Sequence, residues 1–166
     1  ELTAVIGKLR REIPDICIRT TLITGFPGET QEEHEELLSF VDLMEFDRLG
    51  VFTYSQEEDT PAASMPDQIS EEVKETRREQ LMELQQEIAY DAALAMNGRL
   101  VEAMIEGKVV KEDVYVARTY KDAPNVDGFL FINTKRELMT GDFVKCRITG
   151  ACEYDLIGEL EDEFTQ

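Results

Sequence analysis

The sequence has few of the residues that cross-link a protein, bind a metal or place a chain in a membrane. Its three cysteines, Cys17, Cys146 and Cys152, are too few and too scattered for a disulfide framework, and no C-x-x-C spacing indicates a zinc site. We therefore expect buried free thiols. The sequence shows neither a signal-peptide pattern nor an apolar run of membrane length, so the expected setting is a reducing cytoplasm without a membrane.

Basic residues are also scarce. The 166 residues include 17 Lys and Arg against 36 Asp and Glu, which gives a formal charge of −19, and the stretches before and after Arg99 are both acidic. Proteins bind nucleic acids largely through Lys and Arg that neutralise phosphates, so this charge argues against RNA or DNA. A basic protein surface is the more natural partner. The alternative, that acidity only keeps the protein soluble, stays open.

The first 69 residues alternate helical and strand patterns. The expected elements are a helix over 1–13, a strand over 16–23 that is buried on both faces, a helix over 31–45 and a strand over 48–54. Thr30 and Glu33 predict a capping box at the start of the second helix. Two parallel strands make too small a sheet to be stable alone. We therefore expect part of a larger βα barrel whose other strands precede this chain, which would make the chain a fragment.

The remainder of the chain predicts a long helix followed by a small β-barrel. Ser70 can cap the helix, and Asn97-Gly98 can end it. The expected strands are 100–106, 114–119, 128–132, 142–149 and 154–160. Five short strands in so few residues indicate a closed barrel of the OB-like kind. The predicted fold class is thus α/β plus all-β, with domains at 1–69, 70–97 and 98–166.

A Gly25-Phe26-Pro27-Gly28 turn follows the first predicted strand. The carboxyl edge of a parallel sheet is where α/β folds place ligands, and glycines allow the backbone to approach one closely. The sequence lacks the Gly-Lys-Ser/Thr ending of a P-loop, which argues against a nucleoside triphosphate. Taken alone, a tight structural bend explains the turn equally well.

His34 is the single histidine, and no Ser, Cys or carboxylate pattern nearby would make it a general base. We expect it at the surface or half-buried. No catalytic residue and no metal ligand is predicted in this chain.

Several segments together resemble a known enzyme family. The turn with its flanks, TLITGFPGET, and the later segments FDRLGVFTYS, TPAA and MPD resemble the methylthiotransferase branch of the radical S-adenosylmethionine enzymes. Gly98-Arg99-Leu100 resembles the start of their C-terminal TRAM module, a small β-barrel that recognises substrate. Within the branch, RTYKDAPNVDG and GDFVKCRITGACEYDL are most similar to the enzymes that methylthiolate an aspartate of small-subunit ribosomal protein twelve.

The resemblance implies the C-terminal part of a radical-SAM, TIM-like βα barrel followed by the TRAM module. The parent enzyme would use S-adenosylmethionine and two iron–sulfur clusters to place a methylthio group on the β-carbon of the aspartate. Cysteine thiolates hold such clusters, and the family's C-x-x-x-C-x-x-C motif is absent from this sequence. The chain alone is therefore expected to be inactive and to bind no cofactor.

The resemblance also implies two groups of site residues. The strand ends that would flank S-adenosylmethionine are Ile23, Gly25, Phe26, Phe52, Tyr54 and Ser55, whose alternative role is packing inside the barrel. The candidates for contact with the basic ribosomal protein are Arg118, Asp122, Asp127, Glu153 and Asp155. Asp122 and Asp127 flank Pro124 and could equally bond their own backbone, and Arg118 could pair with such a carboxylate.

Two other functions stay open from the sequence. A tRNA methylthiotransferase of the same family would bind RNA with a steep salt dependence. A non-catalytic adaptor would use its β-barrel to bind a basic protein. The sequence upstream of Glu1 would then need no cluster cysteines, whereas an enzyme must have them there. Self-association through the open edge of the partial barrel is also expected, and a strictly monomeric mass in solution would contradict it.

Overall fold

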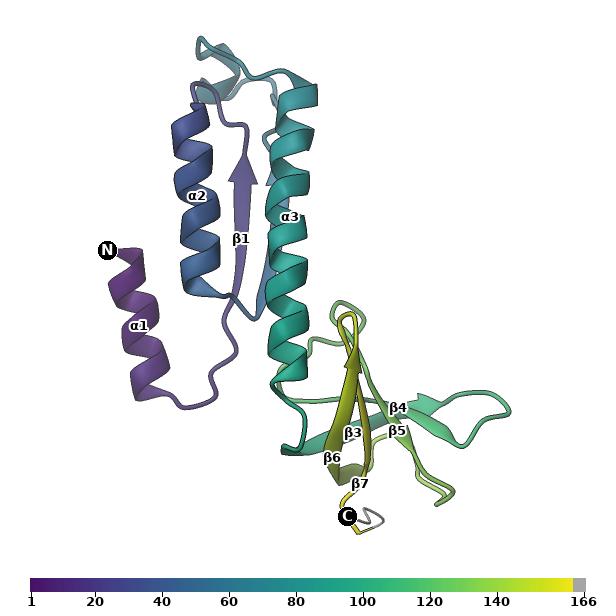
Figure 1. The fold of residues 1–166 in the computed structure, drawn as a ribbon. Coiled ribbons are helices and arrows are strands. Elements are labelled where there is room, and N and C mark those ends of the chain that lie inside the picture. The colour runs from purple at the N-terminus through teal and green to yellow at the C-terminus, as the bar shows by residue number, and fades with distance from the viewer. Residues whose placement is uncertain (163–166) are drawn as a thin grey trace. The chain divides into compact units, whose positions relative to one another are not determined.

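The computed structural model describes residues 1–162, which form two compact units, one from Glu1 to Ala89 and a second that begins at Tyr90 (Figure 1). The last four residues of the predicted β module, 163–166, lie outside the described part. Among the described residues, no helix combines the length and apolar character needed to cross a bilayer.

The first unit is a two-stranded parallel sheet with helices. Its elements are α1 (Leu2–Glu12), β1 (Arg19–Thr24), α2 (Gln31–Met44), β2 (Arg48–Thr53), a short 3-10 helix (Pro61–Ser64) and most of α3 (Glu71–Leu94). In Figure 1, α2 and α3 run alongside the strands. Leu49 and Val51 of β2 share one buried cluster with Val41 of α2 and Leu81 of α3. The core of this unit therefore lies on the helix-covered face of the sheet.

Local signals set the start of α2 as the sequence predicts. The Thr30 hydroxyl accepts from the Glu33 N–H at 3.2 Å, and the Thr30 N–H donates to the Glu33 carboxylate at 2.8 Å. Both halves of the capping box are present, so two of the amides left unpaired at a helix start are satisfied.

The prediction that the first strand is buried on both faces is wrong. Side chains along β1 alternate, with Arg19, Thr21 and Ile23 exposed, while Leu22 packs against the core. The described residues supply helices to one face of the two-stranded sheet, and β-branched composition does not reveal how many layers cover a strand. One face of the sheet is therefore open.

Two further burial predictions need correction. His34 is fully buried, because its position on α2 faces α3, where its Nε2 lies 2.8 Å from the Gln80 side-chain oxygen. Among the cysteines, Cys146 is buried, Cys17 is half-buried and Cys152 is exposed at the end of a strand. The acidic residues around His34 gave no sign in the sequence that its side chain points inward. The expectation of buried thiols holds only for Cys146.

The second unit contains a closed five-stranded barrel. Its strands are β3 (Leu100–Lys108), β4 (Val114–Arg118), β5 (Leu130–Asn133), β6 (Phe143–Cys152) and β7 (Asp155–Leu160). They close in the order β3-β4-β5-β7-β6, and only the β5–β7 pair is parallel. Inward side chains at alternating positions fill the barrel, among them Ala103, Ile105, Ala117, Leu130, Ile132, Cys146, Ile148 and Leu160. This closed barrel confirms the prediction of an OB-like β module.

Candidate functional site

Two large apolar side chains lie exposed on the open face of the first unit's sheet. Ile23 is 60% exposed and Phe52 is 62% exposed, although both sit in regular strands. They are register partners across the parallel pair, close to the carboxyl ends of β1 and β2. Parallel strands are normally covered on both faces. The pair therefore offers an apolar surface at the sheet edge where α/β folds bind ligands.

Glu29 holds the turn that follows β1. Gly25 has a φ of 74°, which a residue with a side chain rarely adopts, and its N–H donates to the Glu29 carboxylate at 2.9 Å. The other carboxylate oxygen accepts from the Thr24 hydroxyl at 3.1 Å. The Gly28 N–H in turn donates to the Asp67 carbonyl at 2.9 Å. Side-chain and backbone hydrogen bonds thus fix the turn, and the Glu29 carboxylate that holds it is largely buried.

Two cations of α3 reach the ends of the strands. Arg77 Nη1 lies 2.7 Å from the Glu29 carboxylate, and both side chains are largely buried. Lys74 Nζ donates to the Tyr54 carbonyl at 3.0 Å and to the Glu71 carboxylate at 2.7 Å. The sequence reasoning did not single out Lys74, Arg77 or Glu29. A signal was present, since Lys74 and Arg77 are two of only nine basic residues through Arg99.

Aromatic rings link the two strand ends. The Phe26 and Tyr54 rings meet edge to face with centroids 5.2 Å apart, and the Lys74 ammonium lies 5.2 Å from the centre of the Tyr54 ring. The Ser55 hydroxyl instead donates to Glu57 in the following loop. Of the predicted strand-end residues, the structure pairs Ile23 with Phe52 and Phe26 with Tyr54, and it leaves Ser55 at the start of an exposed loop.

In the β module, Arg118 and two of the predicted aspartates have partners within the module. Arg118 Nε lies 2.9 Å from the Glu106 carboxylate on the neighbouring strand. The Asp122 carboxylate accepts from the Thr119 N–H at 3.0 Å and from the Thr119 hydroxyl at 2.7 Å. The Asp127 carboxylate accepts from the Ala123 N–H at 2.6 Å. Both aspartates therefore shape the β4–β5 loop, as one of the two sequence interpretations expects.

The β4–β5 loop and the β6–β7 turn approach each other closely. A side chain at Gly128 would overlap the Tyr154 carbonyl, and the Asp155 carboxylate accepts from the Phe129 N–H at 2.7 Å. Glu153 is exposed in the turn itself, with a φ of 54°. The structure thus brings the loop that carries the predicted aspartates together with the turn that carries Glu153 and Asp155. Arg118 lies on β4, at the start of the same loop.

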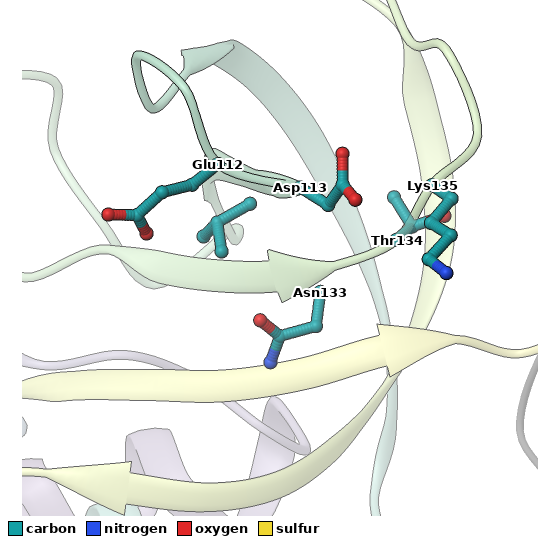
Figure 2. Close-up of a pocket in the computed structure, with 6 residues that line it drawn as sticks. Glu112, Asp113, Asn133, Thr134 and Lys135 are labelled. Carbon is teal, nitrogen blue, oxygen red and sulfur yellow. The ribbon is translucent and has the colours of Figure 1, made fainter.

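The barrel also carries a shallow polar hollow, shown in Figure 2. Its lining residues are Glu112, Asp113, Val114, Asn133, Thr134 and Lys135. The Thr134 N–H donates to the Asp113 carbonyl at 3.0 Å, which joins its two walls. Side chains of both charge signs point outward around it without converging, so the hollow indicates no particular ligand.

The described residues offer no metal centre. Within residues 1–162, no group of three His, Cys, Asp or Glu side chains is placed to hold an ion. Burial, together with the nearby Glu159 charge, raises the pKa of the Cys146 thiol to about 12. Metal ligation needs a thiolate, so Cys146 is a packing residue of the barrel core.

Known proteins match almost the whole length of this chain. The sequence model of the TRAM domain family matches residues 98–160. A protein of Lachnoclostridium phytofermentans named "Ribosomal protein uS12 methylthiotransferase RimO" is 60% identical over 161 residues, which cover 97% of this chain and 37% of that protein. Proteins with the same name from Desulfitobacterium hafniense and Alkaliphilus oremlandii are 49% and 47% identical, each over 96% of this chain and 36% of their own length. The chain spans little more than a third of these curated relatives and matches their C-terminal part.

Proposed function

We propose that the chain belongs, over the residues that it spans, to the RimO-type methylthiotransferase family and forms the C-terminal part of such an enzyme. The proposed enzyme is a radical S-adenosylmethionine methylthiotransferase that modifies the β-carbon of an aspartate in ribosomal protein uS12. The observation that carries this proposal is the 60% identity over 97% of the chain to a relative named for that activity.

The first unit, we propose, supplies part of the wall of the S-adenosylmethionine cavity. Ile23 and Phe52 project from the open sheet face, where an apolar surface suits the adenosine of the cofactor. Gly25 directly follows β1 with a φ of 74°, and the Lys74 stem fills the space beside it, so the turn is held in place at the edge of the proposed cavity. Phe26, Tyr54 and Ser55 would border the same edge. In this family the bound cofactor supplies the radical and the methyl group, while the residues of this chain bind and orient it.

The iron–sulfur clusters are proposed to be held outside this chain. Cluster ligation requires several converging thiolates, and the three cysteines do not provide them, because Cys146 is buried in the barrel and Cys152 is exposed at the end of β6. The residues present therefore fit S-adenosylmethionine but not a cluster.

The β module is proposed to recognise the basic ribosomal protein. The β6–β7 turn, which carries Glu153 and Asp155, packs against the β4–β5 loop, which carries Asp122 and Asp127. Negative charge there would attract Lys and Arg of the substrate, speeding encounter and fixing its orientation. Since the aspartates also accept hydrogen bonds from the loops, Glu153 is the member whose removal least disturbs the fold. Glu153 is therefore the residue best suited to a test.

The proposal can be tested in a chimera in which this chain replaces the matching segment of the Lachnoclostridium phytofermentans relative. With reconstituted clusters, we expect mass spectrometry to detect a methylthio group on the uS12 aspartate. A chimera that modifies tRNA and leaves uS12 unmodified would instead support the tRNA enzyme. A chimera that folds, binds its clusters and modifies neither would favour a non-catalytic binding role for this chain.

The substrate role of the β module has a matched pair of variants. Glu153→Lys and Glu112→Lys make the same charge change at two exposed positions of the barrel. We expect Glu153→Lys to raise the KM for uS12 about fivefold, with a smaller effect for Glu112→Lys, because local charge complementarity acts mainly on encounter. Equal effects from the two variants would mean that only net charge matters and would contradict a site at the β6–β7 turn.

A further inference from the structure

Lys74 is a buried cation near the start of α3, beside the ends of β1 and β2. It is only 2% exposed, yet it stands on α3, whose sequence is otherwise rich in acidic residues. Burying a lysine is costly unless its ammonium is paired and hydrogen-bonded. Here the ammonium has two acceptors, the Tyr54 carbonyl at 3.0 Å and the Glu71 carboxylate at 2.7 Å. The Glu71 side chain is 83% exposed, so the bond to Tyr54 is the one shielded from water.

The aliphatic stem of Lys74 contacts the other strand end. A Cβ built on Gly25 would overlap the Lys74 Cγ and lie 3.1 Å from its Cβ, so the stem occupies the space that a side chain at Gly25 would need. Gly25 follows β1, and Tyr54 follows β2. One side chain therefore touches the chain just after both parallel strands, its stem against one and its charged head against the other.

Five more contacts make the strand ends a connected unit. The Lys74 ammonium lies over the Tyr54 ring, and that ring meets the Phe26 ring edge to face. The Tyr54 N–H donates to the Thr24 carbonyl at 2.9 Å, which extends the strand pairing to this point. One turn further along α3, Arg77 holds Glu29, which in turn binds the Gly25 N–H. A shift of Lys74 would therefore be felt at both strand ends.

We propose that Lys74 is a positioning residue for S-adenosylmethionine: its buried side chain fixes the spacing of the Gly25 and Tyr54 strand ends that border the cofactor. This inference rests on the proposed function of the first unit as a cavity wall. Lys74 stands on α3 and reaches the strand ends through its contacts with Gly25 and Tyr54. It acts on the cofactor wall through the backbone of β1 and β2, which also carries Ile23 and Phe52.

The physical consequence is a binding defect with little effect on chemistry. Lys74→Met keeps most of the stem and removes the ammonium, leaving the Tyr54 carbonyl without its charged donor. The strand ends then gain freedom that cofactor binding must remove, so affinity falls. Once the cofactor is bound, the ends are held again, and the rate at saturating cofactor should change little. A residue needed only for folding would lower the amount of active enzyme without this split.

The experiment uses the full-length chimera described above with its clusters reconstituted. Lys74→Met should raise the Kd and the KM for S-adenosylmethionine about tenfold, as expected for one lost charge-assisted hydrogen bond, while kcat changes less than about twofold. Equilibrium dialysis measures the Kd without turnover. Hydrogen exchange followed by mass spectrometry should show about tenfold faster exchange in the peptides that contain Gly25 and Tyr54.

Two variants serve as controls. Arg78→Met removes a cation from the same helix. Arg78 pairs with Glu75 at the same i, i+3 spacing, but at the surface, so this substitution should leave the Kd, KM, kcat and exchange rates unchanged. Lys74→Arg keeps a donor near the Tyr54 carbonyl and should restore part of the affinity. If Lys74→Met does not fold, Lys74→Arg carries the test, and an unchanged Kd together with altered exchange would then overturn the proposal.

The outcomes separate this inference from the function on which it rests. Unchanged exchange at both strand ends in Lys74→Met contradicts the structural part of the inference, whatever the enzyme does. Faster exchange with an unchanged Kd contradicts the positioning role, even if uS12 is modified. If the unsubstituted chimera binds no S-adenosylmethionine while its clusters are intact, the proposed function fails, and the positioning role fails with it.

Discussion

The two units of this protein bury their strands in opposite ways. In the barrel, inward side chains such as Ile105, Leu130 and Ile132 are fully buried, because the sheet closes on itself and leaves no free edge. In the first unit, Ile23 and Phe52 of the two-stranded sheet are more than half exposed. The same kinds of residue in the same kind of structure thus have opposite environments.

This difference shows that apolar residues in a strand are a sign of burial only where the rest of the sheet or its helices cover them. The barrel supplies its own neighbours for every strand. The described residues of the first unit supply α2 and α3 for one face of its sheet, so the apolar residues of the other face are available to a ligand or to further protein.

The comparison predicts its largest effect for a core residue of the barrel. Ile105→Ala should lower the free energy of unfolding by about 4 kcal/mol, because it removes a fully buried side chain and leaves a cavity. Urea denaturation followed by circular dichroism measures the loss. Val110→Ala is the control, since Val110 is 81% exposed between β3 and β4 and should change stability by less than about 0.5 kcal/mol. Similar losses for the two variants would contradict a packed barrel.

A slightly smaller loss is expected from overfilling the same core. A Cβ on Gly158 would lie 2.5 Å from the Cys146 sulfur and 2.8 Å from the Arg147 carbonyl, so Gly158→Ala should cost about 3 kcal/mol through strain. Gly150→Ala is matched to it, because Gly150 lies on β6 of the same barrel with no atom within 4 Å of the added methyl. Equal midpoints in urea would mean that β6 and β7 are not packed as described.

Much of the fold could be predicted because its signals are local. The capping box at Thr30 and Glu33 lies within four residues, and the alternation of Val144, Cys146 and Ile148 with charged residues marks one strand of the barrel. Both patterns involve residues only a few positions apart, so they can be recognised in the sequence without knowledge of the tertiary contacts. The strand predicted from residue 16 nevertheless begins at Arg19, because the Ile18 N–H is taken by the Asp47 carboxylate from the loop before β2.

The predictions that failed depend on residues far apart in the sequence. His34 is buried because it meets Gln80, 46 residues away, and a helix of acidic neighbours gives no sign of this. Lys74 likewise contacts Gly25 and Tyr54 across long stretches of sequence, 20 residues in the case of Tyr54, so the sequence showed the turn without the residue that holds it. The candidate site was named from family resemblance, and the residues that fix its shape required the structure.

A third prediction concerns pH and the barrel core. The thiol of Cys146 has a pKa of about 12 in the fold, against 9.0 for an ordinary thiol, so between these values the unfolded chain loses a proton that the folded chain keeps. The free energy of unfolding should therefore be unaffected below pH 9 and fall as the pH rises above it. The expected loss from this residue is roughly 1 kcal/mol at pH 10.

The pH effect is isolated by comparing variants, because lysines and tyrosines titrate in the same range. Cys146→Ala should show a shallower decline in stability between pH 8 and pH 10 than the unsubstituted chain, by the amount given above. Cys152→Ala removes an exposed thiol and should follow the unsubstituted chain. A decline in Cys146→Ala as steep as that of the unsubstituted chain would show that this thiol is not desolvated in the fold.

The smallest effect is expected where the composition alone would suggest a large one. Ile23→Ala removes the same atoms as Ile105→Ala, but from a side chain that is 60% exposed, so urea denaturation of this chain should show a loss of less than about 0.5 kcal/mol. In the full-length chimera the same substitution should weaken S-adenosylmethionine binding about fivefold, because the surface that it trims would face the cofactor. Thr21→Ala, two residues earlier on the same exposed face, is the matched control and should leave both quantities unchanged. A stability loss at Ile23 close to that at Ile105 would mean that the open face of the sheet is covered in solution. Both units would then bury their apolar strand residues, the barrel by closing on itself and the first unit by contact with another surface.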